Sequence, residues 1–225
     1  MKITEVRKGV VLVKFDTRYH CASTMMRMQE FYESPFDNIR GKYFTVEQYM
    51  DTYAEAKEKF TYKEGDYVYK GDKNFTYTLD WEAFNITGHI VVDFYHLFGD
   101  MLLEKEKRLF NEIVSYVTSG KKFYLIATYE DTYLGHELAH AYYYMHGEYS
   151  AIMDMLMSEF KRINQIKKCV LSSSGYSEGV AMDEVQAYLA TGTVKSINAD
   201  IGFRVSSNEL GKFHRAFKLF DGKQK

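Results

Sequence analysis

Residues 131–147 read DTYLGHELAHAYYYMHG and contain the pattern His136-Glu137-x-x-His140. Apolar residues recur along this stretch at helical spacing, so it is predicted to be an α-helix. At about 100° per residue, two histidines four positions apart point within about 40° of each other. Both imidazoles can therefore reach one metal ion. Glu137 lies about 100° round the helix, where it can face a water molecule on that ion without binding the ion itself.

The sequence on both sides supports a helix at this position. Residues 122–129, KFYLIATY, are aromatic and β-branched, which is typical of a buried strand. Asp131 or Thr132 is expected to cap the helix, and Gly147 is expected to end it. The helix is predicted to bury an apolar face opposite the histidines, formed by Leu134, Leu138, Ala141, Tyr142 and Met145.

A catalytic zinc ion usually has three protein ligands and a water molecule, so a third ligand is needed. Glu184 is the preferred candidate. It lies in a predicted helix, residues 179–192, on the edge of the apolar arc, whereas Asp183 and Gln186 are expected on the polar side. A carboxylate at the margin of a buried face needs a partner, which is either a metal ion or a cation in a salt bridge.

His146 is the competing candidate, because it stands where the third histidine of the metzincin pattern HExxHxxGxxH would fall. That pattern needs a glycine to break the helix, and Tyr143 occupies the glycine position here. If the helix continues to Met145, His146 points about 100° away from the other ligands. We therefore interpret His146 as a histidine at the C-terminal end of the helix, where the helix dipole favours it.

An HExxH sequence ending at His140 and a helical glutamate at position 184 resemble the gluzincin branch of the zincin metallopeptidases. The segment EVQAY, residues 184–188, is similar to the second-helix motif that supplies the glutamate ligand. Many gluzincins carry an aspartate four residues after that glutamate, where this chain has Tyr188. The resemblance implies one Zn²⁺ per chain, a zincin-like fold with a strand before the HExxH helix, and a peptide or protein substrate.

The residue that stabilises the oxyanion of the reaction is left open by the sequence. Such a residue donates a hydrogen bond to the oxygen on which negative charge develops. Five side chains are chemically able to do so, namely Tyr133, Tyr143, Tyr176, Tyr188 and His214.

The composition limits the classes of protein to which this chain can belong. The chain has 225 residues, of which 46% are hydrophobic and 27% charged, as in an ordinary globular protein. Its formal net charge is −2 and no long basic run occurs, so no nucleic-acid partner is expected. No stretch has the length and apolarity of a signal peptide or a membrane span, which predicts a cytoplasmic protein without a membrane partner.

An α+β fold is predicted. Residues 1–100 are expected to form an N-terminal α+β lobe that serves as a cleft wall or cap, and residues 101–225 a zincin-like metal-binding half, unless both form one body. Strands are expected within 2–16 and helices at 23–32, 45–60, 103–117, 148–169 and 207–220. The stretch 90–98 is compatible with strand or helix, 61–80 with turns in a β-rich connection, and 193–205 with a strand or irregular structure.

Taken together, these features predict a zinc-dependent metallopeptidase in which Glu137 is the general base. Two other classes stay open. One is a zinc hydrolase that acts on a non-peptide amide. The other is a non-catalytic module in which zinc is structural or absent, and the presence of Glu137 disfavours it because a structural site needs no base.

Overall fold

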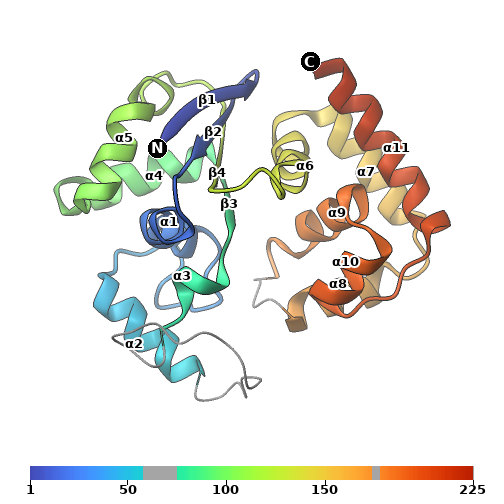
Figure 1. Ribbon diagram of the computed structural model, residues 1–225, viewed down its shortest axis with the longest axis horizontal. Helices are drawn as coiled ribbons and strands as arrows, with labels where there is room; N and C mark the ends of the chain where they lie inside the picture. The colour runs from blue at the N-terminus through green and yellow to red at the C-terminus, as the bar shows by residue number, and fades with distance from the viewer. Residues whose placement is uncertain (58–74, 174–177, 225) are drawn as a thin grey trace.

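The computed structural model describes residues 1–57, 75–173 and 178–224 (Figure 1). Its strands are β1 (Lys2–Arg7), β2 (Val10–Lys14), β3 (Ala83–Thr87) and β4 (Tyr124–Thr128). They form one mixed sheet in the order β1-β2-β4-β3. β2 and β4 run parallel, whereas β1 is antiparallel to β2 and β3 is antiparallel to β4. A small mixed sheet combined with many helices confirms the predicted α+β class.

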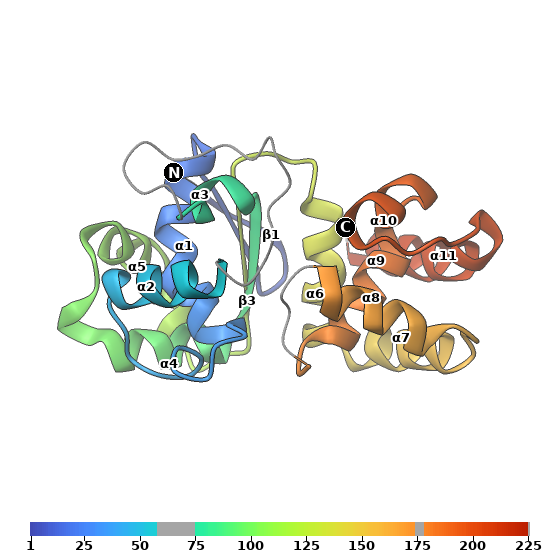
Figure 2. The ribbon, with the colours of Figure 1, turned by 90° about the horizontal axis from the view of Figure 1, so that it is seen from below.

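Helices cover both faces of this sheet, as Figure 2 shows. The N-terminal side carries α1 (Arg18–Glu33), α2 (Val46–Lys57), α3 (Tyr77–Asp80), α4 (Gly88–Phe98), the 3-10 turn η1 (Gly99–Met101) and α5 (Glu104–Val117). The other side carries α6 (Leu134–Met145), α7 (Gly147–Ser158), α8 (Ile163–Ser173), α9 (Ala181–Thr191), α10 (Val194–Ile201) and α11 (Ser207–Gln224). β4 leads directly into α6, so the sheet and the HExxH helix are joined by a short connection.

The alternation of side chains along the strands divides the core in two. Val11 and Val13 of β2 belong to the apolar cluster under the N-terminal helices, and Val10 and Leu12 belong to the cluster under the C-terminal helices. Phe84 and Ile86 of β3 belong to the cluster under the N-terminal helices. The residue between them, Asn85, therefore faces the side on which α6 lies.

Several predicted elements are confirmed. Strands lie within residues 2–16, and helices occupy 104–117 and 207–224. A capping box opens α2, within the predicted helix 45–60: the Thr45 backbone N–H donates to Oε1 of Gln48 over 2.8 Å, and the Gln48 N–H donates to Oγ1 of Thr45 over 3.2 Å. The segment left open at 90–98 is helical. α1 begins earlier than predicted, because Thr17 caps it by accepting from the His20 N–H.

Other predictions were wrong. Residues 148–169 form two helices, α7 and α8, rather than one. The chain turns between them so that Phe160 is buried in the second cluster, with its ring 6.1 Å from that of Phe213. Residues 194–201 are helical rather than extended, because Thr193 and Ser196 form a capping box there. Of the predicted turn-rich stretch 61–80, residues 61–74 lie outside the described residues and 77–80 form a short helix.

The predicted ends of the HExxH helix also need correction. Tyr133 is the N-cap and makes no side-chain cap bond. Asp131 instead pairs with Lys14 over 2.7 Å, which fixes the β4–α6 connection to the end of β2. Gly147 does not simply end the helix, because α7 begins at this residue after a single break at His146.

Residues before and after position 100, the predicted boundary between the two lobes, both contribute to the sheet and to the helical layer on its N-terminal side. α5 packs against α4 and α1, and β4 lies between β2 and β3. The described residues that follow position 133 form the C-terminal helical layer and supply no strand to the sheet. Across the described part of the chain, no helix combines the length and apolarity that a membrane crossing requires.

The N-terminal layer contains a buried carboxyl group, Glu30 of α1, which is 5% exposed. Burial raises its pKa from 4.5 to about 7, although the neighbouring hydroxyl groups of Ser34, Tyr49 and Tyr77 lower it. The folded state therefore holds this proton more tightly than the unfolded chain does. Stability from this group is complete below pH 4.5 and is lost as the pH rises to about 7.

Glu30→Gln should consequently stabilise the protein at pH 8, by up to about 3 kcal/mol, because the amide never has to ionise in the core. At pH 4 the variant and the parent should have nearly equal free energies of unfolding. Urea denaturation at the two pH values measures this difference. A variant that is less stable than its parent at pH 8 would show that Glu30 is not a buried acid of this kind.

Candidate metal centre

Two histidines of α6 and a glutamate of α9 converge at one point. His136, His140 and Glu184 are the described residues whose potential ligand atoms gather within 4.8 Å of one another. His140 and Glu184 are buried, with exposed fractions of 1% and 3%, and the His136 side chain is 22% exposed. α6 and α9 pack directly against each other, which brings the glutamate to the histidine pair. The site is thus closed on the protein side and open beside His136.

The distances between the ligand atoms suit a tetrahedral zinc ion. Nε2 of His136 and Nε2 of His140 are 3.2 Å apart. Oε2 of Glu184 lies 3.6 Å from Nε2 of His136, and Oε1 of Glu184 lies 3.5 Å from Nε2 of His140. A tetrahedral ion with ligand bonds of about 2.0–2.1 Å separates its ligand atoms by about 3.3–3.4 Å. The carboxylate contacts are longer than good hydrogen bonds but match this spacing. Two imidazoles and one carboxylate are also a donor set that zinc favours.

The ligand histidines are oriented by groups on α9. Nδ1 of His140 lies 3.0 Å from Oδ1 of Asp183, and the other ring nitrogen, Nε2, belongs to the ligand group. Nδ1 of His136 lies 3.5 Å from the Thr191 hydroxyl. Tyr188, which stands where many gluzincins carry an aspartate, places its ring 5.0 Å from the His136 ring.

The expectation that Asp183 and Gln186 lie on a polar side was wrong. Gln186 is fully buried, and its amide nitrogen Nε2 donates a hydrogen bond to Oδ1 of Asp183 over 2.9 Å. The Tyr149 hydroxyl donates in turn to Oε1 of Gln186 over 3.4 Å. α9 packs against α6, α8 and α11, so most of its circumference is covered. These residues hold the Asp183 carboxylate against His140.

The charge balance of the site favours a cation. Burial lowers the pKa of His140, but the carboxylates of Asp183, Glu184 and Glu137 outweigh it and raise that pKa to about 10. Without a metal ion the imidazole therefore carries a proton at neutral pH. The surrounding carboxylates stabilise positive charge at this site, whether a proton on His140 or a metal ion carries it. A divalent ion compensates more of their negative charge than a proton does.

Glu137 lies beside the ligand group but outside it. It is 5% exposed, and its Oε2 accepts a hydrogen bond from Nδ2 of Asn85 on β3 over 2.8 Å. Burial raises the pKa of Glu137, while the neighbouring charges of His136 and His140 lower it. A buried carboxylate next to a ligand histidine, with a raised pKa, has the properties of a general base.

A residue of the N-terminal layer also faces the site. Glu33, at the end of α1, is buried, and its Oε2 accepts from Nε2 of Gln29 over 2.7 Å. Burial, followed by the charge of Glu184, raises the pKa of Glu33 well above its ordinary value, and His140 lowers it. The end of α1 is therefore within electrostatic reach of the ligands. No spacing in the sequence connects Glu33 with the HExxH segment.

Three of the candidate oxyanion donors interact with groups other than the ligands. Tyr133 is 38% exposed and bonds to Glu82, and the Tyr143 hydroxyl donates to Asp154 on α7 over 2.5 Å. His214 contacts the Gly192 carbonyl oxygen over 2.9 Å. Tyr176 lies outside the described residues. Among the described candidates, Tyr188 alone has a ring contact with a ligand histidine.

His146 does not join the ligand group. It ends α6, and its ring lies 5.2 Å from that of Phe220 on α11 and 5.9 Å from that of Tyr142. Burial lowers its pKa. The imidazole is thus part of the packing between α6 and α11.

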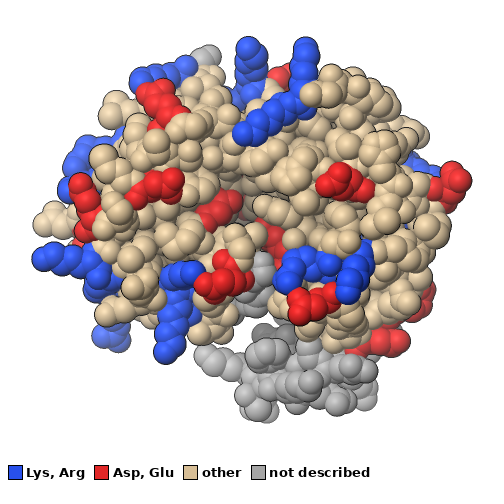
Figure 3. All heavy atoms as spheres, turned by 180° about the vertical axis from the view of Figure 1, so that it is seen from behind, with Lys and Arg blue, Asp and Glu red and all other residues tan. Residues whose placement is uncertain are grey.

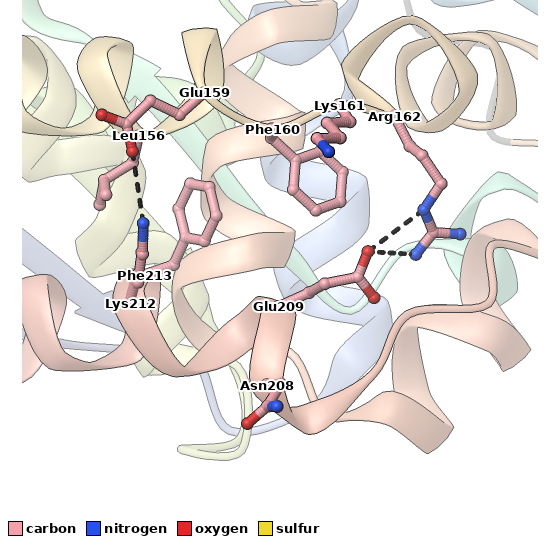
Figure 4. A pocket seen from close by; sticks show the side chains of 9 residues that line it. All are labelled: Leu156, Glu159, Phe160, Lys161, Arg162, Asn208, Glu209, Lys212 and Phe213. Carbon is pink, nitrogen blue, oxygen red and sulfur yellow. Dashed lines mark hydrogen bonds and ion pairs between the residues drawn. The ribbon is translucent and has the colours of Figure 1, made fainter.

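A surface hollow of about 350 Å³ lies elsewhere, between the end of α7 and α11 (Figure 4). No residue of the ligand group lines it. Four of the five charged side chains that line it are paired: Arg162 bonds to Glu209, and Lys212 bonds to Glu159. Figure 3 shows acidic and basic side chains interspersed on one face of the molecule, without a large field of either sign. Neither feature competes with the metal centre as a candidate site.

Comparisons with protein-family models, with curated proteins and with solved structures find no match to this chain. The interpretation of the site therefore depends on its own geometry. Asn85, Asp183 and Glu33 are the polar residues near the ligands that sequence reasoning missed. A signal was present for Asn85, because a polar residue inside the apolar strand AFNIT needs a buried partner.

Proposed function

We propose that this protein is a zinc-dependent metallopeptidase of the zincin type, with His136, His140 and Glu184 as ligands. The observation that carries the proposal is the convergence of two imidazoles and one carboxylate, whose potential ligand atoms lie within 4.8 Å of one another, beside a buried carboxylate outside this group. A strand followed by the HExxH helix, and a glutamate ligand from a later helix, support a gluzincin-like arrangement.

Bound zinc would supply a Lewis acid that acidifies water and polarises the scissile carbonyl group. Glu137 accepts the proton of the attacking water and delivers it to the leaving amine, so that the peptide bond is replaced by a carboxylate and an amine. Asp183 keeps the His140 ring in its ligand orientation. A substrate would approach from the side of His136, the most exposed of the three ligands.

A catalytic role is favoured over a purely structural one. Structural zinc sites in proteins are closed by four protein ligands, whereas the described residues supply three. A structural site would also gain nothing from Glu137, whose burial is costly unless a function or a partner compensates for it. A zinc hydrolase acting on a non-peptide amide would share the metal site and differ in its substrate groove.

Removal of the metal tests the proposal. Purified protein should contain about one equivalent of zinc and cleave members of a broad peptide library or unfolded casein. Incubation with 1,10-phenanthroline should abolish cleavage, and added zinc should restore it. Protein that carries full zinc and cleaves no peptide would favour the non-peptide substrate or the structural metal. Protein that binds no zinc would exclude the proposal.

A further inference from the structure

Side chains of three elements form a chain of hydrogen bonds that ends on Glu137. The Tyr124 hydroxyl of β4 donates to Oδ1 of Asn85 on β3 over 2.5 Å. Nδ2 of Asn85 then donates to Oε2 of Glu137 on α6 over 2.8 Å. All three side chains are buried, so water does not compete for these bonds.

The donor and acceptor groups of the three side chains determine the direction of these hydrogen bonds. An asparagine side chain offers a carbonyl acceptor on one side and an amino donor on the other. An ionised carboxylate can only accept, so the amino group of Asn85 must face Glu137 and its carbonyl must face Tyr124. Burial raises the pKa of Tyr124 well above its ordinary value, so the phenol keeps the proton that it donates. Each member thereby holds the next in a single orientation.

Burial at position 85 is energetically unfavourable for a polar side chain. The surrounding sheet face is apolar, with Val10, Leu12 and Ile126 in the same cluster as Tyr124. A β-branched apolar residue would pack here without the cost of burying an amide. The hydrogen bond to Glu137 compensates for that cost and connects the general base to the sheet, which is a more rigid support than a loop.

We propose that Asn85 is a positioning residue for Glu137 and that Tyr124 holds the Asn85 amide in the required orientation. This inference rests on the proposed function, in which Glu137 is the base. The bond engages Oε2 of Glu137 and restrains rotation of the side chain, so that Oε1 faces the reacting water. β3 and β4 then contribute to catalysis although they supply no ligand.

The first test needs no substrate. The Asn85 side-chain NH₂ signal is identified in ¹⁵N–¹H spectra by its loss in Asn85→Ala. It should exchange slowly with water, and it should shift in both Glu137→Gln and Tyr124→Phe, because each of these variants changes one of its two partners. A signal that keeps its position in both variants would overturn the inference, whether or not the protein is a peptidase.

The second test is a double-mutant cycle on turnover. Asn85→Ala should lower kcat by about 10- to 100-fold, the usual effect of removing an outer-shell group, with KM and zinc content nearly unchanged. In a Glu137→Gln background the same substitution should change kcat less than about twofold, because no base is left to position. Ile86→Val, on the opposite face of β3, is the matched control and should leave kcat unchanged in both backgrounds.

An equal loss from Asn85→Ala in both backgrounds would mark Asn85 as a purely structural residue and overturn the inference. If Asn85→Ala does not fold, Tyr124→Phe takes its place in the cycle, since it removes only the hydroxyl that orients the amide. Zinc-loaded parent protein without any turnover would count against the proposed function alone. The NH₂ signal would then decide whether Asn85 holds Glu137.

Discussion

Replacement of Glu137 by glutamine is expected to lower turnover by about 10²- to 10⁴-fold while the fold and the zinc content remain intact. Glutamine has the same size and can still accept the Asn85 hydrogen bond, but it cannot take a proton from water. Glu137 is also outside the ligand group, so its loss leaves the three ligands in place. Peptide-library cleavage and metal analysis on the same preparation measure the two effects separately.

Glu148→Gln is the matched control for this experiment. It makes the same chemical change at a glutamate of α7 whose side chain is 67% exposed, so turnover should equal that of the parent. If Glu137→Gln is as active as the parent, the base is another group and the role of Glu137 is excluded. If the variant loses its zinc, Glu137 contributes to metal binding in a way that the ligand geometry does not indicate.

The second large effect is expected in zinc affinity. His140→Ala and Glu184→Gln should each lose most of the bound zinc, because the first removes a ligand nitrogen and the second replaces a charged carboxylate ligand by a neutral amide. Asp183→Asn should weaken binding more moderately, by about 10- to 100-fold, since it keeps the shape of the group that orients His140 but removes its charge. Competition against a chelating dye at constant pH ranks the variants on one scale.

His146→Ala provides the control for the zinc series, because it removes a histidine from the end of the same helix. Its ring packs on α11, so zinc affinity should stay close to that of the parent. A loss of zinc from His146→Ala together with full retention by Glu184→Gln would favour the metzincin-like ligand set. In that case α6 would have to break before His146 rather than at it.

Local spacing was sufficient to predict the core of the site. The HExxH pair and Glu137 lie within one helix, so the helical repeat alone determines their relative directions. Glu184 could also be placed, because a carboxylate on the margin of an apolar arc stands out in a wheel diagram. The α+β class followed from strands and helices whose periodicities are clear, such as β2 and α5.

The polar residues around the ligands could not be predicted in the same way. A wheel diagram assumes one buried face, and it therefore assigned Asp183 and Gln186 to solvent. α9 is enclosed by three helices, which buries Gln186 and turns Asp183 towards His140. The break between α7 and α8 has a similar origin, because the burial of Phe160 in the tertiary core outweighs local helix propensity.

The sequence by itself determined the HExxH helix, with its two histidines and its base, because those positions are separated by a single helical turn. Tertiary structure decided what completes the site. Asn85 lies 52 residues before Glu137 and reaches it only because β3 pairs with β4 in a register that turns the amide towards α6. The close approach of Glu184 and Glu33 likewise depends on how distant helices pack, and such contacts are set by the shape and burial of the whole core rather than by spacing along the chain.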